Sequence, residues 1–385
     1  MKHDGYKIWQ SPLSDRISKL VVDSSYRKVI YIADVFNMST PRYRVYNMVQ
    51  ALDYSNSWRG SYFLSSEIGY IADYLKNVDV IVLSRTLWNL GLYNFIEHAK
   101  DLGISIIYDL DDLVFNLDKL ELVVNSLNGD LRDEETLKYW LLYISKIYKM
   151  IKPADYIMVT TKFLEDQVKT VFEHKDIFVI PNFFNEEQLK ISLELIKHKN
   201  GIKDKKDKFV IGYFSGTPSH YHDLRVALPA IFELMKRYKD IYLEVVGYVD
   251  LPEMFNEFLQ IGRVRKNPIM GFLELQKKIA DVDLNIIPLI QNDFTNCKSE
   301  LKYFEASLVK TISCASPTYI YRKIIKDDVN GFLCNSLEWF SKIEQIYKGN
   351  YDRKVPDNAY NYVINKYSPK VQSKDIEKIL NKISK

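Results

Sequence analysis

The sequence alternates short apolar runs with amphipathic segments, and it does so in two successive series. The apolar runs have the length of buried strands, and the segments between them carry apolar residues at helical spacing. The runs with strand character cover 28–33, 78–83, 104–108, 156–159 and 177–180 in the first series, and 209–214, 242–246, 283–288 and 310–314 in the second. Strands that alternate with helices indicate parallel sheets with helices on both faces. We therefore predict an α/β fold built from two similar halves.

A chain of 385 residues is too long for one ordinary core and suits two domains. The charged, glycine-containing run at 199–208 interrupts the alternation and marks the boundary. We expect an N-terminal extension over 1–27, one Rossmann-like domain over 28–200 and a second over 201–365. A C-terminal helix over 366–385 is placed to pack back on the first domain. A cleft between two such domains is a natural ligand site.

The bulk composition excludes some classes of function. The formal net charge of +3 is too small to indicate a nucleic acid as the partner. Three cysteines, Cys297, Cys314 and Cys334, show neither metal-site spacing nor a pairing pattern, which fits a reducing cytosol. The first residues carry no apolar signal core, and no apolar run is long enough to span a bilayer. We therefore expect a cytoplasmic protein.

Lys298 and Glu305 stand seven residues apart on a segment with helical periodicity. An apolar run over 282–289 precedes them and is typical of a buried strand, and α/β sheets bind ligands where such a strand gives way to a helix. The cation lies near the expected helix N-terminus, which favours anions. This arrangement suits a nucleotide diphosphate, with Lys298 for phosphate and Glu305 for ribose hydroxyls. A solvated amphipathic helix explains the spacing equally well.

A second candidate is the loop after the first strand of the second half. Gly216 permits close approach of the backbone, and Ser215, Thr217 and Ser219 supply hydroxyls. Free N–H groups at the start of the next helix suit a phosphate. The loop matches neither the Walker pattern nor G-x-G-x-x-G, which argues against a nicotinamide dinucleotide. Helix capping by Ser219 or Asp223 explains the same residues structurally.

Arginines follow two strands of the first half. Arg42 and Arg44 come after the first strand, and Arg85 follows the strand at 78–83. A guanidinium grips oxyanions with two hydrogen bonds, so these side chains suit contact with an anionic group or a place in the cleft. The capping residues at 39–41 explain the start of a helix there but not the arginines.

Three carboxylates, Asp109, Asp111 and Asp112, end the buried strand at 104–108. They suit a divalent metal, a base with a shifted pKa or hydrogen bonds to sugar hydroxyls, and a capping cluster explains them as well. His220 and His222 have no third ligand spaced nearby, so no metal site is expected there.

These segments together resemble a glycosyltransferase of GT-B architecture, in the broad family 4-like group and its bacterial surface polysaccharide subgroup. The resemblance covers about 28 to 335. The matching stretches are ADYIMVTT at 154–161 with VIPN at 179–182, FSGTPSH at 214–220 with Asp223 and Leu224, DVDLNIIPL at 281–289, the KS.LKY.E pattern at 298–305, VNGFL at 329–333, RYR at 42–44 and YDLDD at 108–112.

The resemblance implies two Rossmann-like domains facing a central cleft, with the acceptor on the first domain and the nucleotide sugar on the second. It implies transfer of a hexosyl or related group from a nucleotide-diphosphate sugar to a glycan or lipid-linked acceptor, with retention of anomeric configuration and without a metal or other cofactor. The implied donor-binding residues are Gly216, Thr217, His220, Lys298, Ser299, Leu301 and Glu305. The catalytic candidates are Lys298, Asp109, Asp111 and Asp112, and the acceptor or cleft residues are Arg42, Arg44 and Arg85.

The chain also departs from the family pattern. Glu305 matches the second glutamate of an E-x7-E arrangement, but Cys297 occupies the position of the first. The loop that often carries an Arg and a Lys for the diphosphate has Ser219, His220 and His222 instead, so we expect Lys298 to take the phosphate role.

Two other functions remain open: a nucleotide-sugar epimerase of the same architecture, and a non-catalytic nucleotide- or glycan-binding module. A lipid-linked acceptor would bring the protein to the inner face of the cytoplasmic membrane. Lys146, Lys149 and Lys152 suit such peripheral association, and a solvated helix face explains them too.

Overall fold

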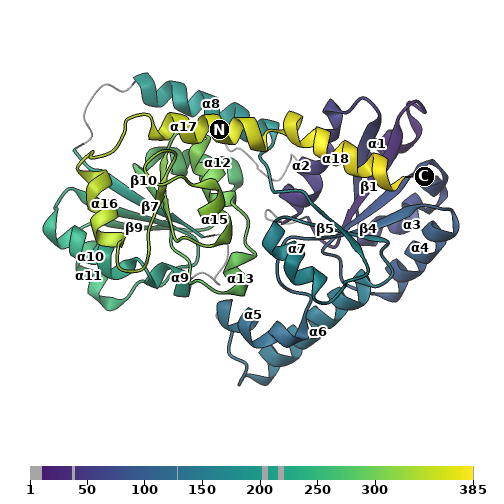
Figure 1. Ribbon diagram of the computed structural model, residues 1–385, viewed down its shortest axis with the longest axis horizontal. Helices are drawn as coiled ribbons and strands as arrows, with labels where there is room; N and C mark the ends of the chain where they lie inside the picture. The colour runs from purple at the N-terminus through teal and green to yellow at the C-terminus, as the bar shows by residue number, and fades with distance from the viewer. Residues whose placement is uncertain (1–10, 37–39, 128, 202–206, 216–220, 385) are drawn as a thin grey trace.

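The computed structural model describes residues 11–36, 40–127, 129–201, 207–215 and 221–384. Within them the chain forms two parallel, six-stranded sheets, each flanked by helices (Figure 1). The predicted α/β fold with two Rossmann-like domains is therefore confirmed.

The first sheet has the strand order β2-β1-β3-β4-β5-β6, and every neighbouring pair is parallel. Its central strand β3 is buried along its whole length, which explains why it is an unbroken apolar run rather than an alternating one. The strands are β1 Arg27–Ala33, β2 Trp58–Leu64, β3 Val80–Ser84, β4 Ser105–Leu110, β5 Tyr156–Val159 and β6 Asp176–Val179. The α-helices of this half are α1 Leu13–Val21, α2 Asn47–Ala51, α3 Ile68–Ile71, α4 Leu90–Asp101, α5 Leu120–Ser126, α6 Glu134–Ile151 and α7 Lys162–Lys169.

The second sheet has the order β12-β11-β10-β7-β8-β9 and is also parallel. The strand order reverses at β7 and β10, and this is where open α/β sheets bind ligands, outside the carboxyl ends. The strands are β7 Phe209–Phe214, β8 Ile241–Val246, β9 Val264–Asn267, β10 Leu284–Ile287, β11 Ile312–Ala315 and β12 Phe332–Leu333. The α-helices are α8 Glu186–Gly201, α9 Tyr221–Arg225, α10 Leu228–Arg237, α11 Asn256–Gln260, α12 Phe272–Asp281, α13 Asp293–Asn296, α14 Leu301–Ser307, α15 Tyr319–Ile324, α16 Trp339–Tyr347, α17 Val355–Tyr367 and α18 Pro369–Ile383.

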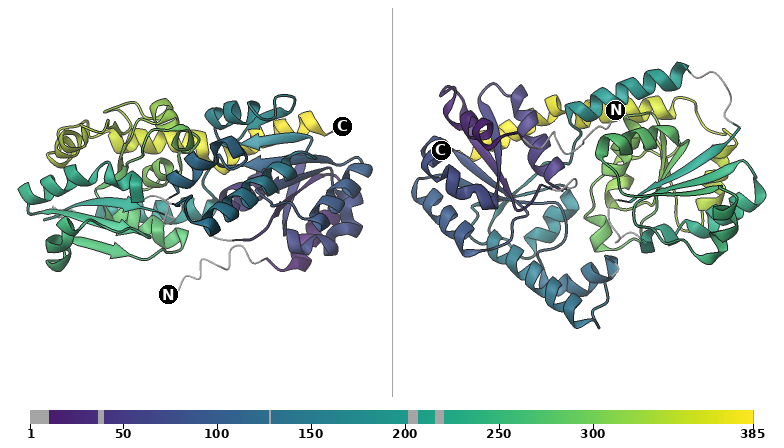
Figure 2. Two further views of the ribbon diagram at one scale, coloured as in Figure 1. Left: turned by 90° about the horizontal axis from the view of Figure 1, so that it is seen from below. Right: turned by 180° about the vertical axis from the view of Figure 1, so that it is seen from behind.

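The chain crosses between the two halves twice. After β6 it enters α8, which packs on α12 of the second half although residues 186–200 fall in the first predicted domain. At the other end, α17 packs on α14 and α18 then packs on α2 of the first half. Figures 1 and 2 show α8, α17 and α18 along one edge of the molecule, with α5 and α6 at the opposite edge.

The first and last helices of the described chain, α1 and α18, are both tied to the first sheet. Within the predicted N-terminal extension, α1 packs on β2, and Arg16 forms a pair of hydrogen bonds with the Glu67 carboxylate, each 2.7 Å long. At the C-terminal end, the Trp58 indole N–H donates to Asn381 Oδ1 at 2.8 Å. In the described part of the chain, no helix is both long and apolar enough to cross a membrane.

The docking of α18 predicts a stability effect at Leu380, which is fully buried in the same apolar cluster as residues of β1 and α2. We expect Leu380→Ala to lower the free energy of unfolding by about 2–5 kcal/mol, because it removes buried methyl groups and leaves a cavity. The neighbouring exposed residue offers a matched control, Lys378→Ala, which we expect to be close to neutral. Urea denaturation measures both, and equal midpoints for the two variants would contradict the docking.

Candidate active site

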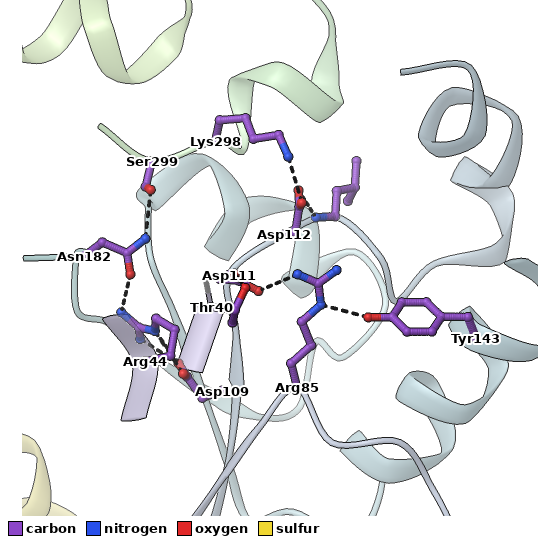
Figure 3. Close-up of polar contacts among 11 residues, drawn as sticks. Thr40, Arg44, Arg85, Asp109, Asp111, Asp112, Tyr143, Asn182, Lys298 and Ser299 are labelled. Atoms are coloured by element: carbon purple, nitrogen blue, oxygen red, sulfur yellow. Dashed lines mark hydrogen bonds and ion pairs between the residues drawn. The ribbon is translucent and has the colours of Figure 1, made fainter. Parts of the chain in front are cut away.

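The two halves meet where the carboxyl ends of their strands face each other. The segments after β1, β4 and β6 of the first half contact the segment that follows β10 in the second. The polar contacts that join them include Asp112–Lys298, Asn182–Ser299 and Arg42–Glu305. We call this region the interdomain site, and Figure 3 shows most of its residues. It gathers residues from four of the motifs on which the sequence resemblance rests.

A buried ion pair between Arg44 and Asp109 lies beneath the interdomain site in the first half. Asp109 ends β4, and Arg44 lies in a single π-helical segment, Arg42–Tyr46. Arg44 Nη2 is 2.6 Å from Asp109 Oδ1, and its Nε is 2.9 Å from Oδ2. Burial opposes the charge on Arg44, but the adjacent Asp109 carboxylate more than offsets it and raises the pKa of the guanidinium. Each side chain is only 1% exposed, so neither presents a surface to a ligand.

Arg44 also connects this pair to the end of β6. Its Nη1 donates to the backbone oxygen of Ile180 at 2.8 Å and lies 3.4 Å from Asn182 Oδ1. The Asn182 amide in turn donates to Ser299 Oγ at 2.9 Å, in the second half. Arg44 and Asp109 therefore hold the ends of β4 and β6 together beside the interdomain site.

Asp111 and Arg85 come together, and both are partly open to solvent. Arg85 Nη1 is 3.1 Å from Asp111 Oδ1, while its Nε donates to the Tyr143 hydroxyl at 3.0 Å. Thr40 Oγ donates to the other carboxylate oxygen at 2.7 Å (Figure 3). Burial raises the pKa of Asp111, but Arg85 and Thr40 outweigh it and hold this pKa below its ordinary value. Asp111 is therefore ionised at neutral pH and suits a hydrogen-bond acceptor for a hydroxyl group.

Lys298 does not lie in the helix that the sequence predicts for it. Helix α14 begins at Leu301, so Lys298 falls in the short connection from α13. Its Nζ is 2.8 Å from Asp112 Oδ2, and it lies 4.1 Å from the centroid of the Phe294 ring. Its side chain retains 22% exposure, so a ligand has access to it. Lys298 would need to exchange Asp112 for a phosphate in order to take the role predicted for it.

Glu305 is held by two residues of the first half. Its Oε1 accepts a hydrogen bond from the Tyr43 hydroxyl and lies 3.2 Å from Arg42 Nη2. The Arg42 guanidinium lies between two aromatic rings, 4.1 Å from the centroid of Tyr43 and 4.6 Å from that of Phe272. No described residue hydrogen-bonds to Oε2. One carboxylate oxygen is thus fixed while the other remains available to a ligand hydroxyl.

Cys297 offers no substitute for the glutamate often found at its position. Its side chain is fully buried in the apolar cluster of the first half. Burial raises the pKa of its thiol well above the ordinary value, so the group stays protonated and neutral. Its backbone oxygen is 3.4 Å from the Thr161 hydroxyl, which adds one more contact between the halves.

The remaining predicted donor residues divide into two groups. Gly216, Thr217 and His220 lie outside the described residues. Ser299 contacts Asn182, and Leu301 is partly buried against the apolar cluster that includes α14. In the part of the chain that the structure describes, no group of three or more His, Cys, Asp or Glu side chains is arranged to hold a metal ion.

Sequence reasoning missed several residues of the interdomain site. Tyr43, Asn182 and Lys302 lie within the RYR, VIPN and KS.LKY.E motifs but had been given no role. Tyr143, on α6, carries no motif signal at all. The only sequence signal for Tyr43, Asn182 and Lys302 was that each is a polar residue within a matching motif.

A cavity of about 470 Å³ opens between the halves beside this site. Its lining includes Asp118 and Glu121 from the first half, and His222, Asp223 and Asn292 from the second. Lys119 and Asp293, each adjacent in sequence to a lining residue, form a salt bridge of 2.8 Å between the halves. The polar lining suits a ligand rich in hydroxyl groups.

No protein-family model and no curated protein sequence matches this chain. Solved structures do match across almost its whole length. The HepE protein of Anabaena, in complex with UDP and glucose, covers 93% of this chain and all of its own at 14% identity, with a TM-score of 0.60. A glycosyltransferase from Rickettsia africae covers 93% of this chain and 98% of its own at 13% identity, with a TM-score of 0.61.

Sucrose-phosphate synthase from Thermosynechococcus elongatus is similar to the same extent. It covers 92% of this chain and 98% of its own at 13% identity, with a TM-score of 0.60. At such identities the likeness establishes the fold. The chain therefore has the GT-B fold that its motifs predicted.

Proposed function

We propose that this protein is a glycosyltransferase that moves a sugar from a nucleotide-diphosphate sugar to a hydroxyl group of a glycan or lipid-linked acceptor, in the synthesis of a surface polysaccharide. The observation that carries the proposal is the interdomain site. At the carboxyl ends of both sheets of a GT-B fold, this site brings together Arg42 of the first half with Lys298 and Glu305 of the second. One oxygen of the Glu305 carboxylate, Oε2, has no hydrogen-bond partner among the described residues. HepE was crystallised with UDP-glucose, so UDP is the first nucleotide to test.

The donor in this proposal binds mainly to the second half. Glu305 Oε2 accepts hydrogen bonds from the ribose hydroxyls, while Tyr43 and Arg42 keep the carboxylate in place through Oε1. Lys298 and Ser299 contact the diphosphate in this proposal, and Gly216, Thr217 and His220, which lie outside the described residues, remain the other donor-binding candidates.

The chemical step breaks the bond between the anomeric carbon and the diphosphate oxygen, and the acceptor oxygen bonds to that carbon. The acceptor hydroxyl gives its proton to the departing diphosphate oxygen, on which negative charge develops as the bond to the anomeric carbon breaks. Positive groups aimed at the leaving diphosphate therefore contribute most to catalysis. We include retention of configuration and independence of metal ions in the proposal. Asp111 and Arg85 orient the acceptor hydroxyls from the first half.

The acceptor also suggests peripheral contact with a membrane. Helix α6 exposes Tyr139, Leu141 and Leu142 next to Lys138, and Lys149 lies over the Trp88 ring further along the helix. Apolar side chains beside lysines on one helix suit the interface of an anionic bilayer.

A nucleotide screen combined with one substitution tests donor binding. We expect UDP, among UDP, GDP, CDP and ADP, to raise the thermal unfolding midpoint, because a ligand bound at 100 times its Kd stabilises the native state by about 2.7 kcal/mol. Glu305→Gln keeps the size of the side chain but loses its charge. We expect it to weaken UDP binding about tenfold, the loss of one charge-assisted hydrogen bond.

The exposed glutamate of α12 gives a matched control, Glu274→Gln, which we expect to bind UDP like the wild type. Isothermal titration calorimetry measures all three proteins. Wild-type affinity in Glu305→Gln would remove Glu305 from the donor site, and failure of the wild type to bind any of the four nucleotides would overturn the proposed function.

A second substitution separates the acceptor from the donor. We expect Asp111→Asn to reduce sugar transfer to alkyl glycosides at least about tenfold, because it removes the ionised acceptor of hydrogen bonds next to Arg85. Donor binding should stay within about twofold of wild type. The control is Asp166→Asn, at an exposed position on α7. Wild-type transfer in Asp111→Asn, or a loss of nucleotide binding that by itself accounts for the lower transfer, is the result that contradicts this assignment.

Membrane contact is tested by co-sedimentation with vesicles that contain phosphatidylglycerol. We expect the wild type to sediment with them, and Leu142→Glu to sediment several-fold less, because a charge on the apolar face opposes insertion. Val22→Glu changes an equally exposed residue at the end of α1 and should leave sedimentation unchanged. Equal sedimentation of the Leu142 variant and the wild type would exclude this face of α6.

A further inference from the structure

Lys302 carries a buried amine that has no partner. It is the second residue of α14, and its Nζ is inaccessible to solvent and forms no hydrogen bond or ion pair with any described residue. The Nζ lies over the Tyr213 ring, 4.9 Å from its centroid. Moving an ammonium group out of water costs several kcal/mol unless an anion or hydrogen-bond acceptors compensate. A ring face provides only part of that compensation.

The surroundings of Lys302 leave its amine protonated but do not provide a carboxylate that pairs with it. Burial lowers the pKa of Lys302 to about 8, and Lys298 acts in the same direction. Asp223 on α9 and Glu305 on α14 oppose the shift, although neither carboxylate forms an ion pair with the amine. Because the pKa stays above 7, most of the amine is protonated at neutral pH. The protein holds a cation here without a matching anion.

The nearby carboxylates already have other partners. Asp223 Oδ1 accepts from the backbone N–H of Ile290 at 3.0 Å, and Glu305 accepts from Tyr43 and Arg42. Lys298 is paired with Asp112 across the domain boundary. Of the two lysines Lys298 and Lys302, only Lys302 therefore lacks a carboxylate partner among the described residues.

The amine also occupies the ligand end of the second sheet. Tyr213 lies near the carboxyl end of β7, and α14 follows β10, its neighbour in the sheet. The side chain of Asn285 on β10 donates to the backbone oxygen of Lys302 at 3.1 Å and fixes the start of the helix against the strand. The strand order reverses between these two strands, and ligands bind outside the carboxyl ends at such a point.

We infer that Lys302 binds an anionic oxygen of the donor's diphosphate, as a second cation beside Lys298, and stabilises the charge of the leaving group. The inference rests on the proposed function. It adds a residue that enters the site already desolvated, so no water has to be removed from its amine when the nucleotide binds. A charge-assisted hydrogen bond to phosphate replaces the missing partner.

The pH dependence of nucleotide binding follows from the sign of the shift. In the free protein the amine loses its proton as the pH rises through about 8, and a bound phosphate favours the protonated form. A diphosphate is fully ionised well below this range, since the second phosphate ionisation lies near pH 6. Binding at pH 9 should therefore draw one proton from the buffer, whereas binding at pH 7 should draw almost none.

The experiment compares UDP with uridine, which lacks phosphate, by calorimetry on the wild type, Lys302→Met and Lys302→Arg. We expect Lys302→Met to weaken UDP binding at least about tenfold and to leave uridine binding unchanged, with partial recovery in Lys302→Arg. Titrations at pH 9 in buffers of different ionisation enthalpy should reveal proton uptake in the wild type and none in Lys302→Met. Lys236→Met, at an exposed position on α10, controls for loss of a positive charge.

Unchanged UDP affinity in Lys302→Met overturns the inference while leaving the proposed function intact. Equal weakening of UDP and uridine also overturns it, because the effect would then not involve phosphate. Thermal unfolding of each variant checks that it is folded, and the arginine variant retains the charge should the methionine variant unfold. If the wild type binds no nucleoside diphosphate, both the inference and the proposed function fail.

Discussion

The buried pair between Arg44 and Asp109 is the interaction on which the interdomain site depends. It joins the π-helical segment after β1 to the end of β4, and Arg44 reaches further to Ile180 at the end of β6. Removing one member of such a pair leaves an uncompensated buried charge and typically costs about 3–5 kcal/mol. The neighbours of these two residues in the sequence, Arg42 and Asp111, are thereby placed at the cleft. Two residues with almost no exposed surface thus determine where the accessible ones stand.

Ion pairs between opposite charges join the two halves at this site. Lys298 meets Asp112, and Glu305 meets Arg42. These pairs are largely shielded from water, so removing one partner leaves a poorly solvated charge and costs more than removing a partner of an exposed pair, which is worth about 0–1 kcal/mol. Lys302 differs from them, since its amine has no hydrogen-bond partner among the described residues. In the proposed function, a nucleotide diphosphate therefore competes with Asp112 for Lys298, whereas no described carboxylate pairs with Lys302.

Periodicity was enough to predict the fold, because strands buried on both faces are continuous apolar runs such as β3, and the helices between them keep a regular stripe. Motif spacing was also enough to bring Asp111 and Arg85 to the carboxyl edge of one sheet. It was not enough for Lys298, because the chain forms the short helix α13 first and starts α14 only at Leu301. The Tyr43–Glu305 contact joins residues 262 positions apart and depends on how the halves dock, which local spacing does not determine. Lys302 was hidden for a similar reason, since only the packed structure reveals that its amine is buried and unpaired.

The return of the chain to the first half has a mechanical consequence. One crossing leads from β6 into α8 and the other from α17 into α18, and both lie along the same edge of the molecule (Figure 1). Because both covalent connections lie on one edge, they keep the halves together there. The halves therefore separate most easily by a hinge rotation about that edge. Such a rotation widens the opposite side most, where α5 faces α13 and the 470 Å³ cavity lies. Lys119 and Asp293 form the only described salt bridge between the α5 region of the first half and the α13 region of the second. Both side chains are partly exposed, so this salt bridge is weak and opposes the rotation only slightly.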